Sequence, residues 1–129
     1  MKKSTLKRCA ALGFAAMLTG CFPARYTTLA ELTPTAEVKE AMTLEQASAI
    51  IKDMIQHPAA GRNTRYPDDR TLGKYTTSIR LRKHNRTGLV LIEVFENKRA
   101  VLEIYAHNQA EGEKFAAAVW RLRQEYRDK

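Results

Sequence analysis

Three stretches in the second half of the chain alternate apolar and polar residues, and they constrain the fold more than any other feature. They cover residues 75–83, 89–96 and 100–107, are rich in β-branched and aromatic side chains, and are separated by turns that contain Asn or Gly. This pattern is typical of antiparallel strands joined as a meander. The sequence therefore predicts a three-stranded antiparallel sheet, with extra edge strands as an open alternative.

The alternation also predicts how the strands pair. A four-residue loop at 85–88 places Leu81 opposite Ile92, and a three-residue loop at 97–99 places Ile92 opposite Ile104. For the second loop, a two-residue turn is the alternative. These registers are favoured because a one-residue slip would turn the wrong side chains inward, whereas here one continuous apolar face results.

The opposite strand face carries the charged residues. The registers place Glu93 opposite Glu103, a repulsion that Arg80 across from Glu93 relieves. Arg80, Arg82 and His84 project from this face and form a candidate basic patch for an anionic partner. A solvated strand face with cross-strand ion pairs is the alternative interpretation.

Two helices are expected to flank the strands. Thr43 and Gln46 form a capping-box pattern before an apolar stripe, and Pro58 ends that helix because His57 before it is disfavoured in helical geometry. Asn108 and Glu111 give a second start of this kind. The last helix, expected over 109–127, presents its buried stripe at Phe115, Ala118, Val119, Leu122 and Tyr126.

Together these elements predict an α+β domain over 42–129, with a helix, a meander and a C-terminal helix packed on the sheet. Its expected core contains Ile92, Val94, Leu102, Ile104, Phe115 and Leu122. A meander closed by a terminal helix, over about residues 75–127, is similar to the end of a pleckstrin-homology-like domain. That resemblance implies a barrel as the alternative architecture.

Two segments remain open at the level of sequence. Residues 58–74 form a long connection rich in Gly, Pro, Asp and Arg, interpreted as hiding a short strand near 64–66 or as a binding loop. Residues 21–41 lack a sustained period and are interpreted as a tether, whose end separation would be roughly 25 Å. An edge strand at Tyr26–Leu32 is the alternative.

The first 20 residues have the order of a secretory signal peptide. Lys2, Lys3, Lys7 and Arg8 precede a short apolar stretch, and Leu18-Thr19-Gly20-Cys21 then resembles the lipobox of bacterial lipoproteins. The resemblance implies diacylglyceryl transfer to the Cys21 thiol, cleavage before Cys21 and acylation of the new amino terminus. An ordinary signal peptide that ends near a cysteine is the alternative.

The lipobox resemblance also implies a place in the cell. Residues 1–20 would be removed and the domain would be held by lipid at a bacterial membrane. Phe22 stands where lipoproteins of the inner membrane often carry Asp, which favours the periplasmic face of the outer membrane.

Composition agrees with export. The removed segment carries four basic residues and no acidic one, so the formal net charge falls from +8 to +4, and nucleic acid is not an expected partner. Cys9 would be discarded and Cys21 acylated. The mature domain then has no thiol for a disulfide, a metal or nucleophilic catalysis.

No catalytic or metal motif is recognisable. His57, His84 and His107 lack the spacing of a zinc site, and Asp68-Asp69 after Pro67 is more typical of a turn than of an acid–base pair. Ser48 and Ser78 lack the surroundings of a nucleophile elbow. We therefore expect no metal, cofactor or catalytic residue.

Trp120 lies at the border of the apolar stripe of the last helix. It is interpreted either as an anchor for a partner or as a residue at the rim of the core. The sequence thus predicts a lipid-anchored, non-enzymatic module that supports envelope assembly or binds an envelope component. The expected partner is an envelope protein or an anionic envelope polymer, and the candidate binding residues are Arg80, Arg82, His84 and Trp120. The alternative is a periplasmic enzyme or ligand-binding accessory that uses residues 58–74.

Overall fold

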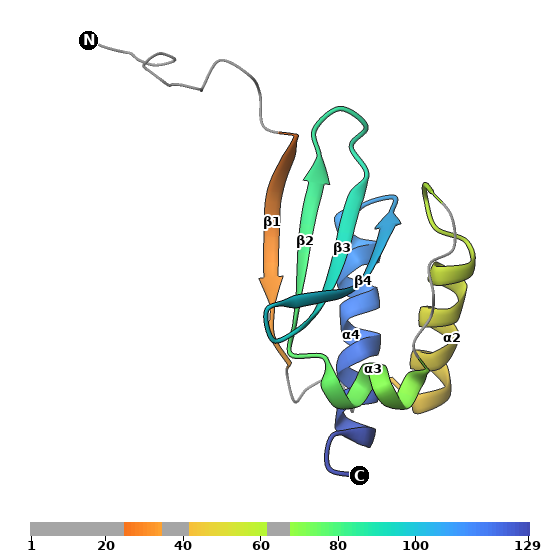
Figure 1. Ribbon diagram of the computed structural model, residues 1–129. Helices are drawn as coiled ribbons and strands as arrows, with labels where there is room; N and C mark the ends of the chain where they lie inside the picture. The colour runs from red at the N-terminus through yellow and green to blue at the C-terminus, as the bar shows by residue number, and fades with distance from the viewer. Residues whose placement is uncertain (1–24, 35–41, 62–67) are drawn as a thin grey trace.

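The computed structural model describes residues 25–34, 42–61 and 68–129, in which a four-stranded sheet stands against helices (Figure 1). The sheet is antiparallel with the order β1-β2-β3-β4. Its strands are β1 (Tyr26–Leu32), β2 (Ser78–His84), β3 (Val90–Glu96) and β4 (Arg99–Ala106), and the helices are α2 (Leu44–Gln56), α3 (Asp69–Tyr75) and α4 (Gln109–Tyr126). The α+β class is confirmed. The barrel alternative is wrong, because over the described residues the sheet is open.

The meander has the predicted register. Leu81 pairs with Ile92, and Ile92 pairs with Ile104. The β3–β4 connection combines the two alternatives: a two-residue turn lies at Asn97 and Lys98, and a register shift after Val94 restores the inner pairing that a longer loop would give. Asn97 has a φ of 59°, which asparagine tolerates better than most residues.

The interpretation of residues 21–41 as a tether is wrong over Tyr26–Leu32. These residues form β1, which pairs with β2 along its length, from Tyr26 opposite His84 to Leu32 opposite Ile79. A bulge at Leu29 separates two parts of the strand. The sheet therefore begins at Tyr26, well before the domain boundary expected at residue 42.

The two expected helices are present with their caps. Thr43 accepts from the Gln46 backbone, and the Gln46 side chain accepts from the Thr43 backbone, which completes the capping box of α2. Asn108 caps α4 by accepting from the Glu111 backbone N–H at 2.9 Å. Both helices thus begin where the sequence predicted.

The last part of the connection at 58–74 forms a helix, α3, which the sequence did not predict. Asp68 caps α3 by accepting from the Thr71 N–H at 2.8 Å, so the adjacent acids mark a helix start. A Cβ atom on Gly73 would lie 2.6 Å from the Leu122 carbonyl oxygen, which shows how closely α3 approaches α4. The strand expected near 64–66 lies outside the described residues.

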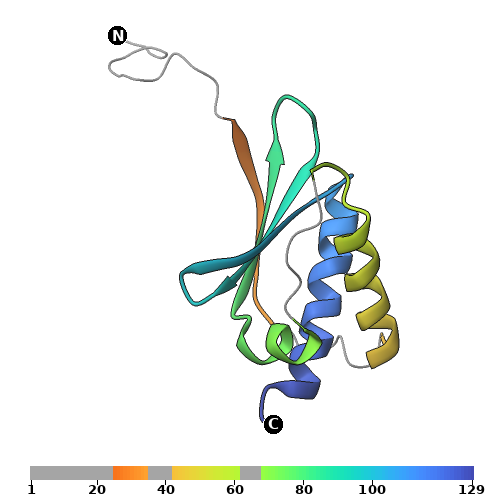
Figure 2. The same ribbon diagram turned by 45° about the vertical axis from the view of Figure 1, so that its right-hand side comes forward.

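The core lies between the sheet and the helices. Figure 2 shows α2 and α4 on the same side of the sheet, with α3 near the C-terminal end of α4. All six predicted core residues are buried: Ile92, Val94, Leu102, Ile104, Phe115 and Leu122. Among the residues described, no helix combines the length and apolarity that a membrane crossing requires.

Candidate functional site

The sheet has a second face, which no described helix covers (Figure 2). We call it the open face and define it by Tyr26, Arg80, Arg82, Leu91, Glu93, Phe95 and Tyr105, which the register and the alternation of side chains place on one side. Two of these residues are buried although they face away from the helices: Glu93 is 3% exposed and Leu91 is 7% exposed. The open face is therefore partly covered by its own side chains.

Glu93 is the centre of this face. Its Oε1 accepts hydrogen bonds of 2.8 Å from Nε of both Arg80 and Arg82, and its Oε2 accepts a bond of 2.9 Å from Nη2 of Arg82. Burial alone would raise the pKa of Glu93, but the two guanidinium groups outweigh it and the pKa is lowered. Glu93 is thus a buried carboxylate held ionised by two arginines.

A pair of tyrosine side chains spans the open face. The hydroxyl groups of Tyr26 and Tyr105 are hydrogen-bonded at 2.6 Å, although Tyr26 lies in β1 and Tyr105 in β4, at opposite edges of the sheet. In a flat sheet, β1 and β4 would be separated by three interstrand spacings of about 4.8 Å each. The twist of the sheet brings the two edge strands closer on this face, so that the two tyrosine side chains meet. The hydrogen bond, followed by burial, raises the pKa of Tyr105 to about 12.

The arginines are also fixed by aromatic rings. The guanidinium carbon of Arg82 lies 4.6 Å from the Tyr26 ring centroid, and that of Arg80 lies 5.2 Å from the Phe95 centroid. Both side chains keep partial access to water, at 35% exposure for Arg80 and 27% for Arg82. The open face is thus a preorganised surface of guanidinium and aromatic groups.

The predicted basic patch is changed by this arrangement. Arg80 and Arg82 share Glu93, and Glu31 lies across from Arg80 in β1. Glu103 lies opposite Glu93 on β4, as the register predicted. Three carboxylates therefore offset two guanidinium groups, so this face is not a cationic surface.

The two remaining binding candidates are placed differently. His84 packs edge-on against Tyr26 with ring centroids 5.1 Å apart, and its Nδ1 accepts from the Thr87 N–H. His84 therefore borders the open face. Trp120 is only 3% exposed and belongs to the core, because α2 and α3 both pack on α4 and widen its buried side. Its assignment as a partner anchor is thus corrected to a core residue.

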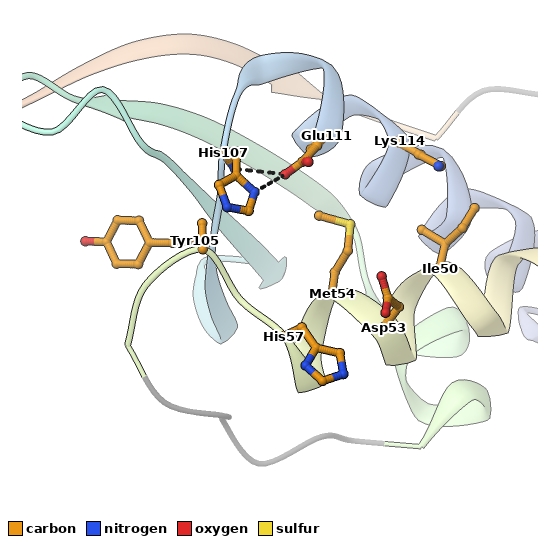
Figure 3. Close-up of a pocket in the computed structure, with 9 residues that line it drawn as sticks. Ile50, Asp53, Met54, His57, Tyr105, His107, Glu111 and Lys114 are labelled. Atoms are coloured by element: carbon orange, nitrogen blue, oxygen red, sulfur yellow. Dashed lines mark hydrogen bonds and ion pairs between the residues drawn. The ribbon is translucent and has the colours of Figure 1, made fainter.

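A cavity of about 190 Å³ lies between α2, the end of β4 and the start of α4. Ile50, Asp53, Met54 and His57 come from the α2 side, and Ala59, Tyr105, His107, Glu111 and Lys114 complete the lining. Figure 3 shows Met54 and Asp53 directed into the gap toward α4, while the Tyr105 ring points away to the open face. The sequence missed this cavity, because its residues come from three separate elements.

The cavity mixes charges of both signs. Glu111 Oε1 accepts from the His107 backbone N–H at 2.8 Å and lies 3.1 Å from His107 Nδ1, and the backbone bond chiefly lowers the pKa of Glu111. Lys114 and His57 add donors on either side. Such a lining suits a small polar ligand that carries a carboxylate or phosphate.

The other residues singled out in the sequence have structural partners. Ser48 donates to Asp69 at 2.6 Å, which ties α2 to α3. His57 and His107 both line the cavity, while His84 lies at the sheet. In residues 25–34, 42–61 and 68–129, no three His, Cys, Asp or Glu side chains gather as metal ligands. Cys21 lies outside the described residues.

Comparison of the chain with protein-family models, with curated proteins and with solved structures gives no match. The function is therefore inferred from the residues and their geometry.

Proposed function

We propose that the protein is a lipid-anchored envelope lipoprotein, held through Cys21 at the periplasmic face of the outer membrane, whose domain binds a partner protein through the open face. The observation that carries the binding role is the ordered set of guanidinium and aromatic groups around Glu93 on the uncovered side of the sheet. Tyrosine and arginine are the residues most enriched where protein interfaces concentrate binding energy.

The geometry favours a protein partner over an anionic polymer. A polyanion is attracted by net positive charge, whereas here Glu31, Glu93 and Glu103 offset the two arginines. The fixed guanidinium groups instead suit a surface that offers carbonyl or carboxylate acceptors together with apolar contact area. Preorganisation reduces the entropy lost when that surface binds.

Site-specific photo-crosslinking in intact cells tests the binding role. A photoreactive amino acid at Thr28, an exposed residue opposite Arg82, should capture a defined partner protein. The same probe at Lys52, exposed on α2, is the matched position away from the open face. Equal capture at the two positions would contradict the proposal.

A charge variant separates specific capture from chance proximity. Arg82→Gln in the chain with the Thr28 probe should reduce capture of that partner, because Arg82 both stacks on Tyr26 and donates to Glu93. Lys98→Gln removes one positive charge from the exposed β3–β4 turn, outside the open face, and should leave capture unchanged. Circular dichroism must show that both variants are folded.

The anchor is tested separately by labelling with fatty acid. Cys21→Ser should abolish incorporation, because the acyl chains are expected on the Cys21 thiol and amino terminus. Cys9→Ser should be nearly silent, since Cys9 lies in the segment that is removed. Equal labelling of wild type and Cys21→Ser would refute lipidation at this residue.

The cavity favours a second candidate function, that of a periplasmic ligand-binding accessory. It adjoins the start of the 58–74 connection through His57 and Ala59, and the Lys114 ammonium offers a positive charge to an anionic ligand. Thermal melting of the protein with small carboxylates and phosphates tests it. A rise in melting temperature that Lys114→Gln abolishes would support this role.

A further inference from the structure

The start of β1 is close in the chain to the proposed lipid anchor. Five residue steps separate Cys21 from Tyr26, and a fully extended chain of that length spans at most about 17 Å. The separation of roughly 25 Å expected for a long tether does not apply, because β1 is part of the sheet. A lipidated Cys21 would therefore hold the beginning of β1 near the head groups.

That end of the molecule is a defined surface. The backbone N–H of Asn85, in the β2–β3 turn, donates to the Arg25 carbonyl at 2.9 Å, so this turn lies beside the start of β1. In Figures 1 and 2 the same end holds the β2–β3 turn and the start of α4, whereas the β3–β4 turn and the C-terminus lie toward the other end. We call the first end the anchor pole and define it by Arg25, Lys83 and Arg86.

The three residues of the anchor pole are cationic and exposed. Within the described residues no ion pair involves any of them, in contrast to Arg80 and Arg82 on the open face. The anchor pole thus carries three exposed positive charges without an ion-pair partner among the described residues, at the end of the sheet nearest to Cys21 in the chain.

We infer that the anchor pole docks on anionic phospholipid head groups, so that Cys21 and the three cations together fix the orientation of the domain on the membrane. This inference rests on the proposed lipidation of Cys21. The attraction acts within about 10 Å of a charged surface at moderate salt, a distance that the short connection makes accessible. Docking at this pole leaves the open face at the side of the domain, where a partner can reach it.

The orientation of the domain can be measured with a fluorophore on one introduced cysteine, because Cys9 and Cys21 are the only cysteines of the sequence and Cys9 lies in the segment expected to be removed. Once Cys21 is acylated, a cysteine introduced at Thr87 in the β2–β3 turn, or at Lys98 in the β3–β4 turn, is the single reactive thiol. The full-length precursor is processed in cells, and the purified lipoprotein is labelled with a fluorophore. It is then placed in vesicles that carry a head-group quencher, made of phosphatidylcholine with or without phosphatidylglycerol.

Thr87→Cys should be quenched much more than Lys98→Cys, and this difference should grow when phosphatidylglycerol is present and shrink at high salt. Each cation near an anionic surface is expected to change the ratio of docked to undocked domain about fivefold. Combining Arg25→Gln, Lys83→Gln and Arg86→Gln should therefore reduce quenching at the Thr87→Cys label to the level seen in phosphatidylcholine alone.

A matched variant removes three exposed cations from the opposite end, at Lys98, Arg99 and Arg127, and should leave quenching at the Thr87→Cys label unchanged. Equal quenching at the Thr87→Cys and Lys98→Cys labels, or full quenching in the variant without the anchor-pole cations, refutes docking while the anchor stands. A wild-type protein that incorporates no fatty acid and leaves the vesicles refutes the anchor, and docking with it.

Discussion

Replacing Glu93 with glutamine tests whether the open face is organised around a buried carboxylate. Glu93→Gln keeps the shape of the side chain but removes the charge that both Arg80 and Arg82 contact at 2.8 Å. A hydrogen bond to a charged group contributes about 1.5 to 3 kcal/mol, and breaking a fully buried ion pair costs about 3 to 5 kcal/mol. The arginines are about one-third exposed and regain water, which lowers the cost. We expect a loss of about 2 kcal/mol in the free energy of unfolding.

The pH dependence gives an independent check on the same residue. The pKa of Glu93 is lowered in the folded protein, so its contribution is fully present above the unfolded pKa of about 4.3. As the pH falls through the lower folded pKa, that contribution is lost. The difference in stability between wild type and Glu93→Gln should therefore be largest near neutral pH and shrink in acid.

Urea denaturation followed by circular dichroism measures both effects. With a urea slope of about 1 to 3 kcal/mol per molar, the expected loss moves the midpoint by roughly 1 M. Glu103→Gln is the matched control, because Glu103 lies directly opposite Glu93 but is exposed, and its removal should be neutral or slightly stabilising. A Glu93→Gln midpoint within error of wild type, with unchanged pH dependence, would refute the account of Glu93 as the centre of this face.

Three further predictions concern packing and the tyrosine pair. Tyr105→Phe should lower the free energy of unfolding by about 1 kcal/mol, as measured by urea denaturation. The pKa of Tyr105 is raised to about 12 in the folded protein, so the wild-type contribution should be complete below pH 10 and should be lost as the pH rises toward 12. Gly73→Ala should cost about 1 to 3 kcal/mol, because its Cβ would lie 2.6 Å from the Leu122 carbonyl oxygen. Gly112→Ala should cost less, because its Cβ would lie 3.0 Å from a side-chain carbon of Leu81, which can yield more readily than backbone. Ile92→Ala should cost about 2 to 5 kcal/mol, and an unchanged denaturation midpoint would remove Ile92 from the core.

The strand register was predictable because it follows from alternation alone. Leu81, Ile92 and Ile104 occupy alternate positions on their strands, and one face of the sheet had to be buried. The same reasoning correctly placed Arg80 across from Glu93. It could not show that Arg82 joins this pair, since that contact depends on where a diagonal side chain turns in three dimensions.

The elements that the sequence did not predict each have a physical cause. α3 was missed because it is seven residues long and contains Gly73, a residue unfavourable in helices but required here by the close approach to Leu122. The position of Trp120 was left open because a single apolar stripe describes a helix packed on one side, whereas α4 contacts the sheet and two helices. Both outcomes depend on tertiary neighbours that periodicity does not report.

β1, which the sequence was interpreted to place in a tether, contributes to both proposed surfaces. Its bulge at Leu29 places Tyr26 and Thr28 on the open face and Ala30 and Leu32 toward the helices, so the strand never shows a continuous period of two. The same strand supplies Tyr26 to the bridge with Tyr105 and brings the chain end nearest to Cys21 against the β2–β3 turn. One edge strand therefore completes the surface proposed for a protein partner and limits how far that surface could lie from the proposed lipid anchor at Cys21. Lengthening the chain between Cys21 and Tyr26 should leave the open face intact while weakening the orientation at the membrane, because strand pairing holds Tyr26 in the sheet, whereas the proposed orientation depends on the length of chain before Tyr26.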